Sequence, residues 1–364
     1  MNKKSIVISS LLTLTMTGAI ASPPPTVQAD RATQLEVVDT LIAKLNANYV
    51  FPDKAKQVEA VLRQRQREGK YDGITDGKQL ATQLTDDIDG LVHDKHMSVG
   101  FSPRPVPSED AMPPPPQTRE AWEKLAPPAV REKVRTSNLG VEKVERLSPN
   151  IGYLQISSFT PAFLVSEKYA AAMNALADTD GLIVDLRKNG GGGGDSVALL
   201  ISYFFDERTR LNDTWERASG VTTQYWTQDQ LEGKRYGGKK PVLVLTGPDT
   251  KSAAESFAYT MQALKRATII GERTWGGANA ARLYRLSEHF YATIPSRRTI
   301  SPITGTNWEG VGVIPDIAAT PDNALTVAMD LLQRRLGGSA AQARPSAPVA
   351  GIPGASDTPV TPRN

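Results

Sequence analysis

The stretch "PVLVLTGPDTKSAAESFAYTMQALKRATIIGE", residues 241 to 272, places two apolar runs on either side of a segment with helical periodicity. "VLVL" has the character of a buried strand, and Phe257, Met261 and Leu264 then recur at helical spacing. "ATIIGE" is a second strand-like run. Two buried strands joined by a helix predict an α/β architecture for this part of the chain.

The same alternation extends over residues 136 to 336, which we expect to form one α/β core. "NIGYLQISSF" and "GLIVDLR" read as strands, and "SEKYAAAMNALADT" and "SVALLISYFF" read as helices. The last predicted helix, "NALTVAMDLLQRRLGG", ends at its glycines. Residues 337 to 364 are rich in Pro, Ala and Ser, a composition that predicts a disordered tail.

Residues 30 to 100 have a different pattern. Three segments carry apolar residues every three or four positions, with Asp or Gly at their boundaries, and so predict a small helical unit. Nine prolines then fall between Pro103 and Pro128. We therefore expect residues 101 to 135 to be a stiff connector with little regular structure.

The first 29 residues have the pattern of a secretory signal peptide: two lysines, about a dozen apolar residues and then small residues. Cleavage after Ala21 or after Ala29 fits this pattern, and it predicts a periplasmic or secreted protein without a membrane segment in the mature chain. The sequence contains no cysteine, which excludes disulfides and thiolate zinc sites. Its net charge of +3 comes from 42 basic and 39 acidic residues without a long basic block, so nucleic acid is not an expected partner.

Ser252 lies at the predicted strand-to-helix junction, and the residue pattern allows two interpretations. A serine there could be a nucleophile, because the first N–H groups of a helix are unpaired and favour developing negative charge. Ser252 and Glu255 also form Ser-x-x-Glu, the pattern of a capping box that has no chemical role. The fragment alone does not separate the two.

Three further stretches contain residues that could act with Ser252. "DLRKNGGGGGD" (185–195) offers glycine amides that could bind an anion or oxyanion. "LVHDKHMSV" (91–99) holds two of the three histidines, and a serine nucleophile needs a base. "GTNWEGVGVIPD" (305–316) presents a glutamate that could orient an imidazole. A metal site is not expected, because too few further ligands accompany the histidines.

These four stretches, in this order, resemble the carboxyl-terminal processing (tail-specific) serine proteases, in the branch that holds the tricorn protease core and the interphotoreceptor retinoid-binding-protein modules. The resemblance is carried by "VHDKHMSV", "DLRKNGGGG", "TKSAAESFAYTMQALKRATIIGERTWGGA" and "NWEGVGVIPD". It implies a crotonase-like, spirally wound ββα core preceded by a helical unit. No PDZ-type segment is evident between residues 92 and 150.

The resemblance also implies roles for individual residues. It makes Ser252 the nucleophile, His96 the general base and Glu309 the carboxylate that orients the base. Dyad proteases of this family carry a lysine where this chain has Gly277, so a lysine base is not expected. Lys95 stands where the tricorn core has a supporting serine, and that role stays unassigned.

For the oxyanion hole the resemblance implies the amides of Ala253 and Gly191, with a register good to about one residue in a run of five glycines. We therefore expect an exported serine endopeptidase that forms an acyl-enzyme on peptide or protein substrates and uses no cofactor. The alternative is a non-catalytic carrier of apolar ligands on the same fold, because a fold does not determine a function.

Overall fold

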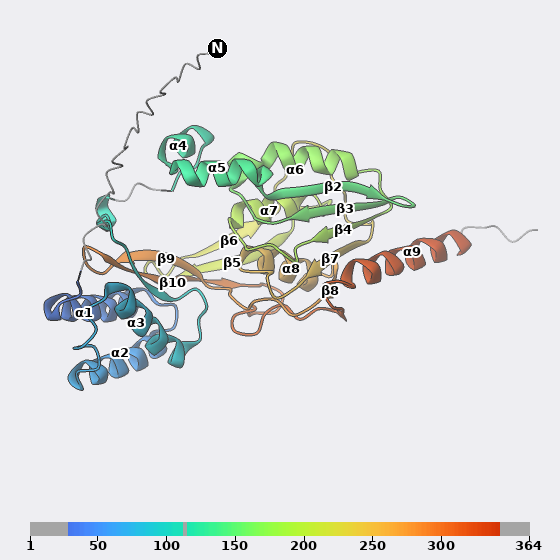
Figure 1. Cartoon of the computed structure of the whole chain (residues 1–364). Helices are drawn as coiled ribbons and strands as arrows, with labels where there is room; N and C mark the ends of the chain where they lie inside the picture. Colours follow the sequence, from blue (N-terminus) through green and yellow to red (C-terminus); the bar gives the residue numbers. More distant parts are fainter. Residues whose placement is uncertain (1–27, 112–114, 343–364) are drawn as a thin grey trace, which may run out of the picture.

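The computed structural model describes residues 28–111 and 115–342 (Figure 1). The expected signal peptide therefore lies outside the described residues, except for its last two positions. Most of the expected Pro/Ala-rich tail, from residue 343 onward, also lies outside them.

The chain forms nine α-helices and eleven strands over the described ranges. The helices are α1 (Arg31–Asn48), α2 (Pro52–Arg67), α3 (Gly77–Val92), α4 (Arg119–Leu125), α5 (Pro128–Thr136), α6 (Ala162–Leu176), α7 (Gly194–Ser202), α8 (Ala253–Ala263) and α9 (Ala324–Gln342). The strands are β1 (Ser98–Phe101), β2 (Val141–Leu147), β3 (Ile151–Ile156), β4 (Gly181–Asp185), β5 (Arg210–Glu216), β6 (Thr222–Trp226), β7 (Val242–Thr246), β8 (Thr268–Gly271), β9 (Ala280–Arg285), β10 (Phe290–Ile300) and β11 (Ile317–Ala318).

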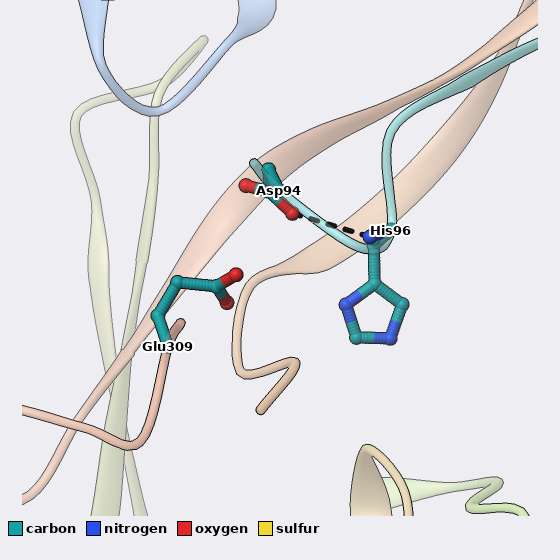
Figure 2. A group of neighbouring side chains, drawn as sticks. All are labelled: Asp94, His96 and Glu309. Atoms are coloured by element: carbon teal, nitrogen blue, oxygen red, sulfur yellow. Dashed lines mark hydrogen bonds between the residues drawn. The ribbon is translucent and has the colours of Figure 1, made fainter. Parts of the chain in front are cut away.

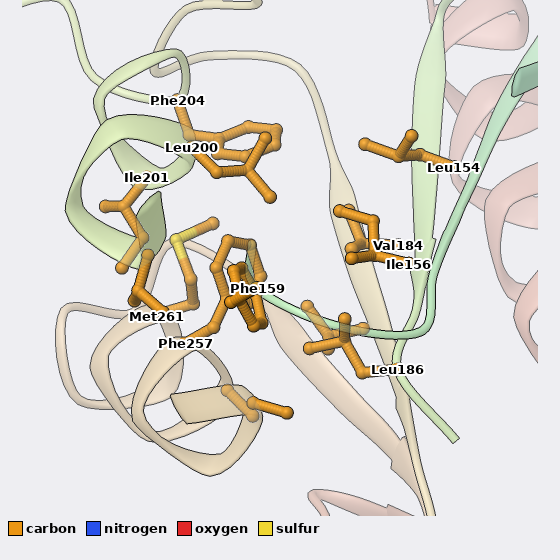
Figure 3. Close-up of a cluster of buried hydrophobic side chains, with 14 of the residues drawn as sticks. Leu154, Ile156, Phe159, Val184, Leu186, Leu200, Ile201, Phe204, Phe257 and Met261 are labelled. Carbon is orange, nitrogen blue, oxygen red and sulfur yellow. The ribbon is translucent and has the colours of Figure 1, made fainter. Parts of the chain in front are cut away.

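The larger sheet has the strand order β11-β8-β7-β4-β3-β2, in which only β2 runs antiparallel to its neighbour. Its strands are buried on both faces. Val242 and Val244 point into a core with α6, α7 and α8, whereas Leu243 and Leu245 face α9. Figure 3 shows the first of these cores, where aromatic and aliphatic side chains of α7 and α8 meet those of β3 and β4. The expected α/β class is confirmed.

The smaller sheet has the order β1-β10-β5-β6, with β9 also paired to β10. It joins the helical N-terminal part to the rest of the molecule (Figure 1). Phe290, Ala292 and Ile294 of β10 lie in one core with side chains of α1, α2 and α3. The expected helical unit is thus present, and it is packed directly on a sheet built from distant parts of the sequence.

Two local expectations were wrong. The proline-rich connector contains regular structure: the Thr118 hydroxyl caps α4, and Pro128 occupies the first turn of α5, where proline is well tolerated. Helix α9 also continues through Gly337 to Gln342 instead of ending at the glycines. Within residues 28–111 and 115–342, none of the helices combines the length and apolar character needed to cross a bilayer.

Candidate active site

The predicted nucleophile and the glycine loop meet at one edge of the larger sheet. Strands β4 and β7 are adjacent and parallel, so the segments that follow them leave the sheet on the same side. The glycine loop follows β4, and Ser252 follows β7. This carboxyl edge is where open α/β sheets usually place their ligands.

Ser252 has an unusual backbone conformation for a helix cap. It is the N-cap of α8, with φ 51° and ψ −112°. N-cap residues normally adopt the extended region with negative φ. A positive φ in a serine is strained, and strain of this kind is concentrated at functional sites, including strand-to-helix turns that present a nucleophile. The capping-box pattern is therefore present in a conformation that a cap alone does not require.

Glu255 organises the backbone around the serine. Its buried carboxylate accepts the N–H of Ser252 (2.9 Å), the hydroxyl of Thr274 (2.5 Å) and the N–H groups of Gly276 (2.6 Å) and Gly277 (3.0 Å). Burial raises the pKa of this carboxyl, and the four donors act in the opposite direction. Glu255 thus fixes the start of α8 against the loop that follows β8.

The glycine loop lies against the nucleophile with almost no free space. Gly191 has φ +100°, and a Cβ added there would be 2.9 Å from the Lys251 carbonyl oxygen and 3.0 Å from the Ser252 Cβ. Only glycine fits this position. The fully buried Asn189 holds the loop, because its Nδ2 donates to the Ile156 carbonyl (3.0 Å) and its Oδ1 accepts the Gly191 N–H (2.9 Å).

This hydrogen bond affects the expected oxyanion hole, because it occupies the Gly191 N–H. The N–H of Gly192, one residue further, makes no hydrogen bond to the described part of the chain. Gly192 lines the same cavity as Ser252 and Ala253. As the first residue of α8, Ala253 has an N–H without an intrahelical partner.

His96 and Glu309, which are far apart in the sequence, are brought together at this site with Asp94. One polar side-chain atom from each lies within 4.8 Å of the others. Figure 2 shows the Glu309 carboxylate turned toward the side of the imidazole that carries Nδ1. Both the His96 Nδ1 and the Glu309 Oε1 are buried without a hydrogen-bond partner among the described residues. The same three groups are close enough together to share a cation.

The environment of these groups changes their protonation. The other oxygen of Glu309, Oε2, accepts the N–H groups of Ala278 (2.6 Å) and Asn279 (3.0 Å). Burial, together with the nearby charge of Asp94, raises the pKa of Glu309 to about 7. Burial lowers the pKa of His96, which favours the neutral imidazole that a general base needs.

Asp94 positions the segment that carries the histidine. Its Oδ1 accepts the backbone N–H of His96 (3.2 Å), and its Oδ2 accepts the Asn279 Nδ2 (3.3 Å) and the Tyr49 hydroxyl (3.3 Å). Burial raises the pKa of Asp94, against the effect of these donors. The N-terminal helices therefore contribute directly to the site through Tyr49.

Gly277 leaves room for the His96 ring. A Cβ added at Gly277 would lie 2.3 Å from a ring carbon of Trp275 and 2.8 Å from the His96 Cε1. The two rings pack edge to face with centroids 5.1 Å apart. The Gly277 N–H donates to the same Glu255 oxygen as the Ser252 N–H. The His96 imidazole therefore lies beside Gly277, and Gly277 and Ser252 donate to the same Glu255 oxygen.

The other histidines and the neighbouring lysines are engaged elsewhere. His93 is an exposed C-cap of α3, and the His289 Nδ1 lies 3.0 Å from the Ser102 carbonyl oxygen. Lys251 forms an ion pair with Asp249 (3.1 Å). The Lys95 ammonium donates to the Trp275 carbonyl. In the described ranges no serine is hydrogen-bonded to the His96 ring or to the Glu309 side chain, so a supporting serine stays unassigned.

A cavity of about 350 Å³ opens beside Ser252. Apolar side chains of α7 form part of its wall, and one face of the smaller sheet forms another part. The aromatic residue Tyr225 also lines this cavity, whereas Trp275 packs on His96 and Trp226 packs on the Arg208 guanidinium, 4.8 Å from its ring centroid. The polar part of its lining includes Gly192, Asp195, Asn212, Thr214, Arg297 and Thr299.

A strained serine at a helix start, a glycine loop with an amide that is free of hydrogen bonds among the described residues, and a half-buried histidine next to a carboxylate form the arrangement of a serine hydrolase. Comparison of the sequence with protein families identifies the family. Residues 150–319 match Peptidase family S41, and residues 26–134 match the N-terminal domain of Peptidase_S41 in eukaryotic IRBP. The two matches are consecutive and together cover most of the chain. The chain therefore belongs to the S41 family of serine peptidases.

Curated relatives are similar over about half of the chain. A carboxy-terminal-processing protease of Bartonella bacilliformis is 28% identical over 177 residues, which are 47% of this chain and 39% of the relative. The tricorn protease of Thermoplasma volcanium is 29% identical over 174 residues, 48% of this chain and 15% of the relative. The matched region thus spans well under half the length of these relatives.

Solved structures share the fold at low sequence identity. A photosystem II D1 C-terminal processing protease aligns with a TM-score of 0.50 and 18% identity, covering 85% of this chain and 98% of the other. The tricorn protease aligns with a TM-score of 0.53 and 16% identity, covering 84% of this chain and 37% of the other. The likeness extends over the helical N-terminal part as well as the α/β core.

Sequence reasoning missed several residues that build the site. Asn189 and Asp94 lie within motifs that were singled out, but their hydrogen bonds to the Gly191 and His96 amides depend on loop geometry. Tyr49 and Asn279 lie outside any motif. A tyrosine at the end of an amphipathic helix is a common feature, so the sequence pattern alone could not identify Tyr49 as a site residue.

Proposed function

We propose that this protein is an exported serine endopeptidase in which Ser252 is the nucleophile, His96 the general base and Glu309 the carboxylate that orients the imidazole. The observation that carries the proposal is the placement of the His96 ring over Gly277, the position at which dyad proteases of the family carry a lysine. The Trp275 ring and the His96 imidazole together occupy the space into which that lysine would project. The proton of Ser252 therefore has a histidine acceptor in this chain.

In the acylation step, the His96 Nε2 takes the hydroxyl proton and the Ser252 oxygen attacks the peptide carbonyl carbon. The imidazolium then gives the proton to the leaving amine nitrogen as the C–N bond breaks, which leaves an acyl-enzyme ester. In deacylation, His96 removes a proton from water, the hydroxide attacks the ester, and Ser252 recovers its proton. Glu309 supports both steps by accepting the Nδ1–H once the two unpartnered atoms approach.

For the oxyanion hole we propose the amides of Ala253 and Gly192. The Ala253 amide is as expected, whereas the glycine donor moves one residue from Gly191, because the Gly191 N–H is already bonded to Asn189. Each donor to a developing oxyanion contributes about 3 kcal/mol of barrier reduction. The Asn189 bond then has a separate role, which is to hold the loop so that the next amide faces the cavity.

The carrier alternative is less well supported by the cavity. An arginine, Arg297, and a buried asparagine, Asn212, line it beside the serine. An apolar ligand would leave the Arg297 Nε and the Asn212 Oδ1, which have no partner among the described residues, still unsatisfied, and this is unfavourable. A peptide offers carbonyl, amide and side-chain groups that can satisfy them.

Export is proposed from the first residues of the sequence. Ala29 is buried, and its N–H donates to the Thr75 carbonyl (2.8 Å). Cleavage after Ala29 would remove this contact, so Ala21 is the favoured cleavage position. Mass spectrometry of the protein recovered from a periplasmic or culture fraction tests this choice.

Digestion of an unfolded protein such as reduced casein tests the proposed activity. The wild type should cleave it, also after treatment with EDTA, and both Ser252→Ala and His96→Ala should lose at least about 10³-fold in rate. His93→Ala should keep wild-type activity. Full activity in His96→Ala, or loss of activity with EDTA, would contradict the proposed mechanism.

A further inference from the structure

Arg297 has an unusual position in the cavity beside Ser252. It lies on β10, on the face of the smaller sheet that lines the cavity together with Thr214 and Thr299. Its guanidinium makes no hydrogen bond and no ion pair with any residue in the described ranges, and its Nε is buried. A buried guanidinium N–H without an acceptor is unfavourable.

Several partly buried arginines have acceptors, whereas Arg217, Arg285 and Arg298 share with Arg297 a buried Nε that has no partner among the described residues. Arg187 pairs with Asp185 (2.5 Å), and Arg210 pairs with Asp213 (2.5 Å). Arg266 donates to the carbonyls of Phe204 (2.7 Å) and Gly237 (2.6 Å). Arg297 is the arginine that lines the cavity of the nucleophile, and its fork of donors is free to bind a ligand there.

The nearby acidic groups form no ion pair with Arg297 within the described ranges. Asp195, in the first turn of α7, also lines the cavity, and its Oδ2 accepts the N–H of Ala162, the first residue of α6 (2.8 Å). Glu216 is opposite Arg297 on β5, and its carboxylate accepts the Ser219 hydroxyl (2.8 Å). No cation in the described part of the chain lies within 4.0 Å of this carboxylate. Arg297 and Asp195 are thus the two charged residues that line the cavity, and no acidic group in the described ranges engages the guanidinium.

We propose that Arg297 makes this cavity a subsite for a carboxylate of the substrate, so that the peptidase prefers cleavage sites at which an acidic group enters the cavity beside Ser252. The proposal rests on the proposed peptidase function. A guanidinium binds a carboxylate through two parallel N–H···O bonds, which matches the free donors of Arg297. The hydroxyl of Thr214, on the neighbouring strand, can provide a further donor, whereas the Thr299 hydroxyl already donates to the Ala278 carbonyl (3.2 Å).

The carboxylate can come from an acidic side chain or from the free C-terminus of a short peptide. Both present the same planar, anionic group to the arginine, and the experiment must therefore separate them. Matched peptides with Glu or Gln at the mapped cleavage position, each with a free or an amidated C-terminus, make this distinction.

The test uses the full chain with Arg297→Gln and, as a matched control, Arg298→Gln. Arg298 is the next residue on β10 and also has a buried Nε without a partner, but its guanidinium lies 5.7 Å from the Phe51 ring and it does not line the cavity. The wild type and Arg298→Gln should prefer the carboxylate peptide by roughly 10- to 100-fold in kcat/KM. Arg297→Gln should lose this preference while still cleaving the Gln peptide. A preference that follows the Glu side chain identifies the side chain, and one that follows the free C-terminus identifies the terminus.

A binding measurement separates failure of this inference from failure of the proposed function. Fluorescence anisotropy with Ser252→Ala and labelled Glu and Gln peptides requires no turnover. The Glu peptide should bind roughly 10-fold more tightly or better, and Arg297→Gln in the same background should remove the difference. Equal binding of the two peptides, or a preference that survives Arg297→Gln, would overturn the inference even if casein is cleaved. Absence of cleavage together with selective binding would instead overturn the peptidase proposal.

Discussion

The site has two ends: the nucleophile end around the proposed nucleophile Ser252, and the base end around the proposed base His96. At the nucleophile end, the Glu255 carboxylate accepts four N–H or O–H donors. At the base end, the Glu309 carboxylate accepts two, and its Oε1 has no partner among the described residues. The His96 Nδ1 beside it is also unpartnered. Buried polar groups are normally satisfied, so an unsatisfied pair requires an explanation.

The difference follows from how each end is built. The nucleophile end is formed by loops at the ends of adjacent parallel strands, which a buried sheet holds in place. The base end is assembled from the segment between α3 and β1, the loop after β8 and the loop before β11, and it also includes Tyr49 at the end of α1. We interpret the nucleophile end as preorganised and the base end as a pair of groups that form their hydrogen bond when substrate is bound.

Removal of the Glu309 charge should produce the largest effect within this comparison. Glu309→Gln keeps an acceptor for the Ala278 and Asn279 amides but can no longer stabilise an imidazolium. We expect kcat to fall by roughly 10² to 10⁴-fold, with KM nearly unchanged, in a peptide cleavage assay. An equal loss in a variant of the exposed Glu288, used as a control, would show that the effect is not specific to the base end.

Crowding the imidazole should have the next largest effect. Gly277→Ala places a methyl group 2.8 Å from the His96 Cε1 and 2.3 Å from the Trp275 ring, so both rings must move. We expect activity to fall by about 10²-fold, the scale seen when a catalytic group is displaced by about 1 Å. Gly90→Ala, on α3 with no atom within 4 Å of the added methyl group, should leave activity unchanged. Wild-type activity in Gly277→Ala would exclude His96, as positioned here, from the reaction.

The pH dependence of stability should show the raised pKa of Glu309, the carboxylate at the base end. Because the pKa of Glu309 is raised to about 7 from an ordinary value of about 4.5, the folded chain binds more protons than the unfolded chain between these pH values. The contribution of Glu309 to stability therefore falls as pH rises from about 4.5 to about 7. Urea unfolding should show Glu309→Gln more stable than the wild type by roughly 1 to 3 kcal/mol at pH 8, with a smaller difference at pH 5.

An unchanged difference between pH 5 and pH 8 would contradict the raised pKa of Glu309. Glu288→Gln provides the matched control for this measurement, because its side chain is exposed and should show no such trend.

Strain at the nucleophile should give the smallest effect. Ser252→Gly removes the hydroxyl but relieves a positive φ, and so it should be more stable than Ser252→Ala by roughly 1 kcal/mol. If Ser252 served mainly as a cap, both variants would instead be less stable than the wild type, Ser252→Ala by about 1 kcal/mol. Thermal unfolding of the three proteins distinguishes these outcomes.

The elements that the sequence predicted well are those with a single clear pattern. Strands β4 and β7 are buried on both faces and are continuously apolar, and α1 to α3 repeat apolar residues at helical spacing. Strand β10, "FYATIPSRRTI", was not predicted, because one part packs on the N-terminal helices and another lines the cavity beside Ser252, so its pattern changes along its length. Local residue patterns cannot show which distant segments will cover each face.

The site was predictable to a similar degree. Ser252, His96 and Glu309 were named through the resemblance of four short motifs, and the structure places His96 and Glu309 together and His96 next to Gly277. The proposed shift of the oxyanion donor from Gly191 to Gly192 depends on one hydrogen bond from the Gly191 N–H to the Asn189 Oδ1, which five consecutive glycines do not reveal. The free Arg297 was not predicted, because the absence of a partner is a property of the folded chain.

The most direct test of the Ser252–His96 pair is the rate of modification by a fluorophosphonate, followed by intact mass across pH 4 to 9 in the wild type and in His96→Ala. We expect a single adduct on Ser252, absent from Ser252→Ala, with a rate that rises through one ionisation below the ordinary histidine value of about 6.5, because burial lowers the pKa of His96. His96→Ala should react at least about 10²-fold more slowly. An equal rate in His96→Ala, or a rise that begins only above about pH 8, would show that another group activates the serine.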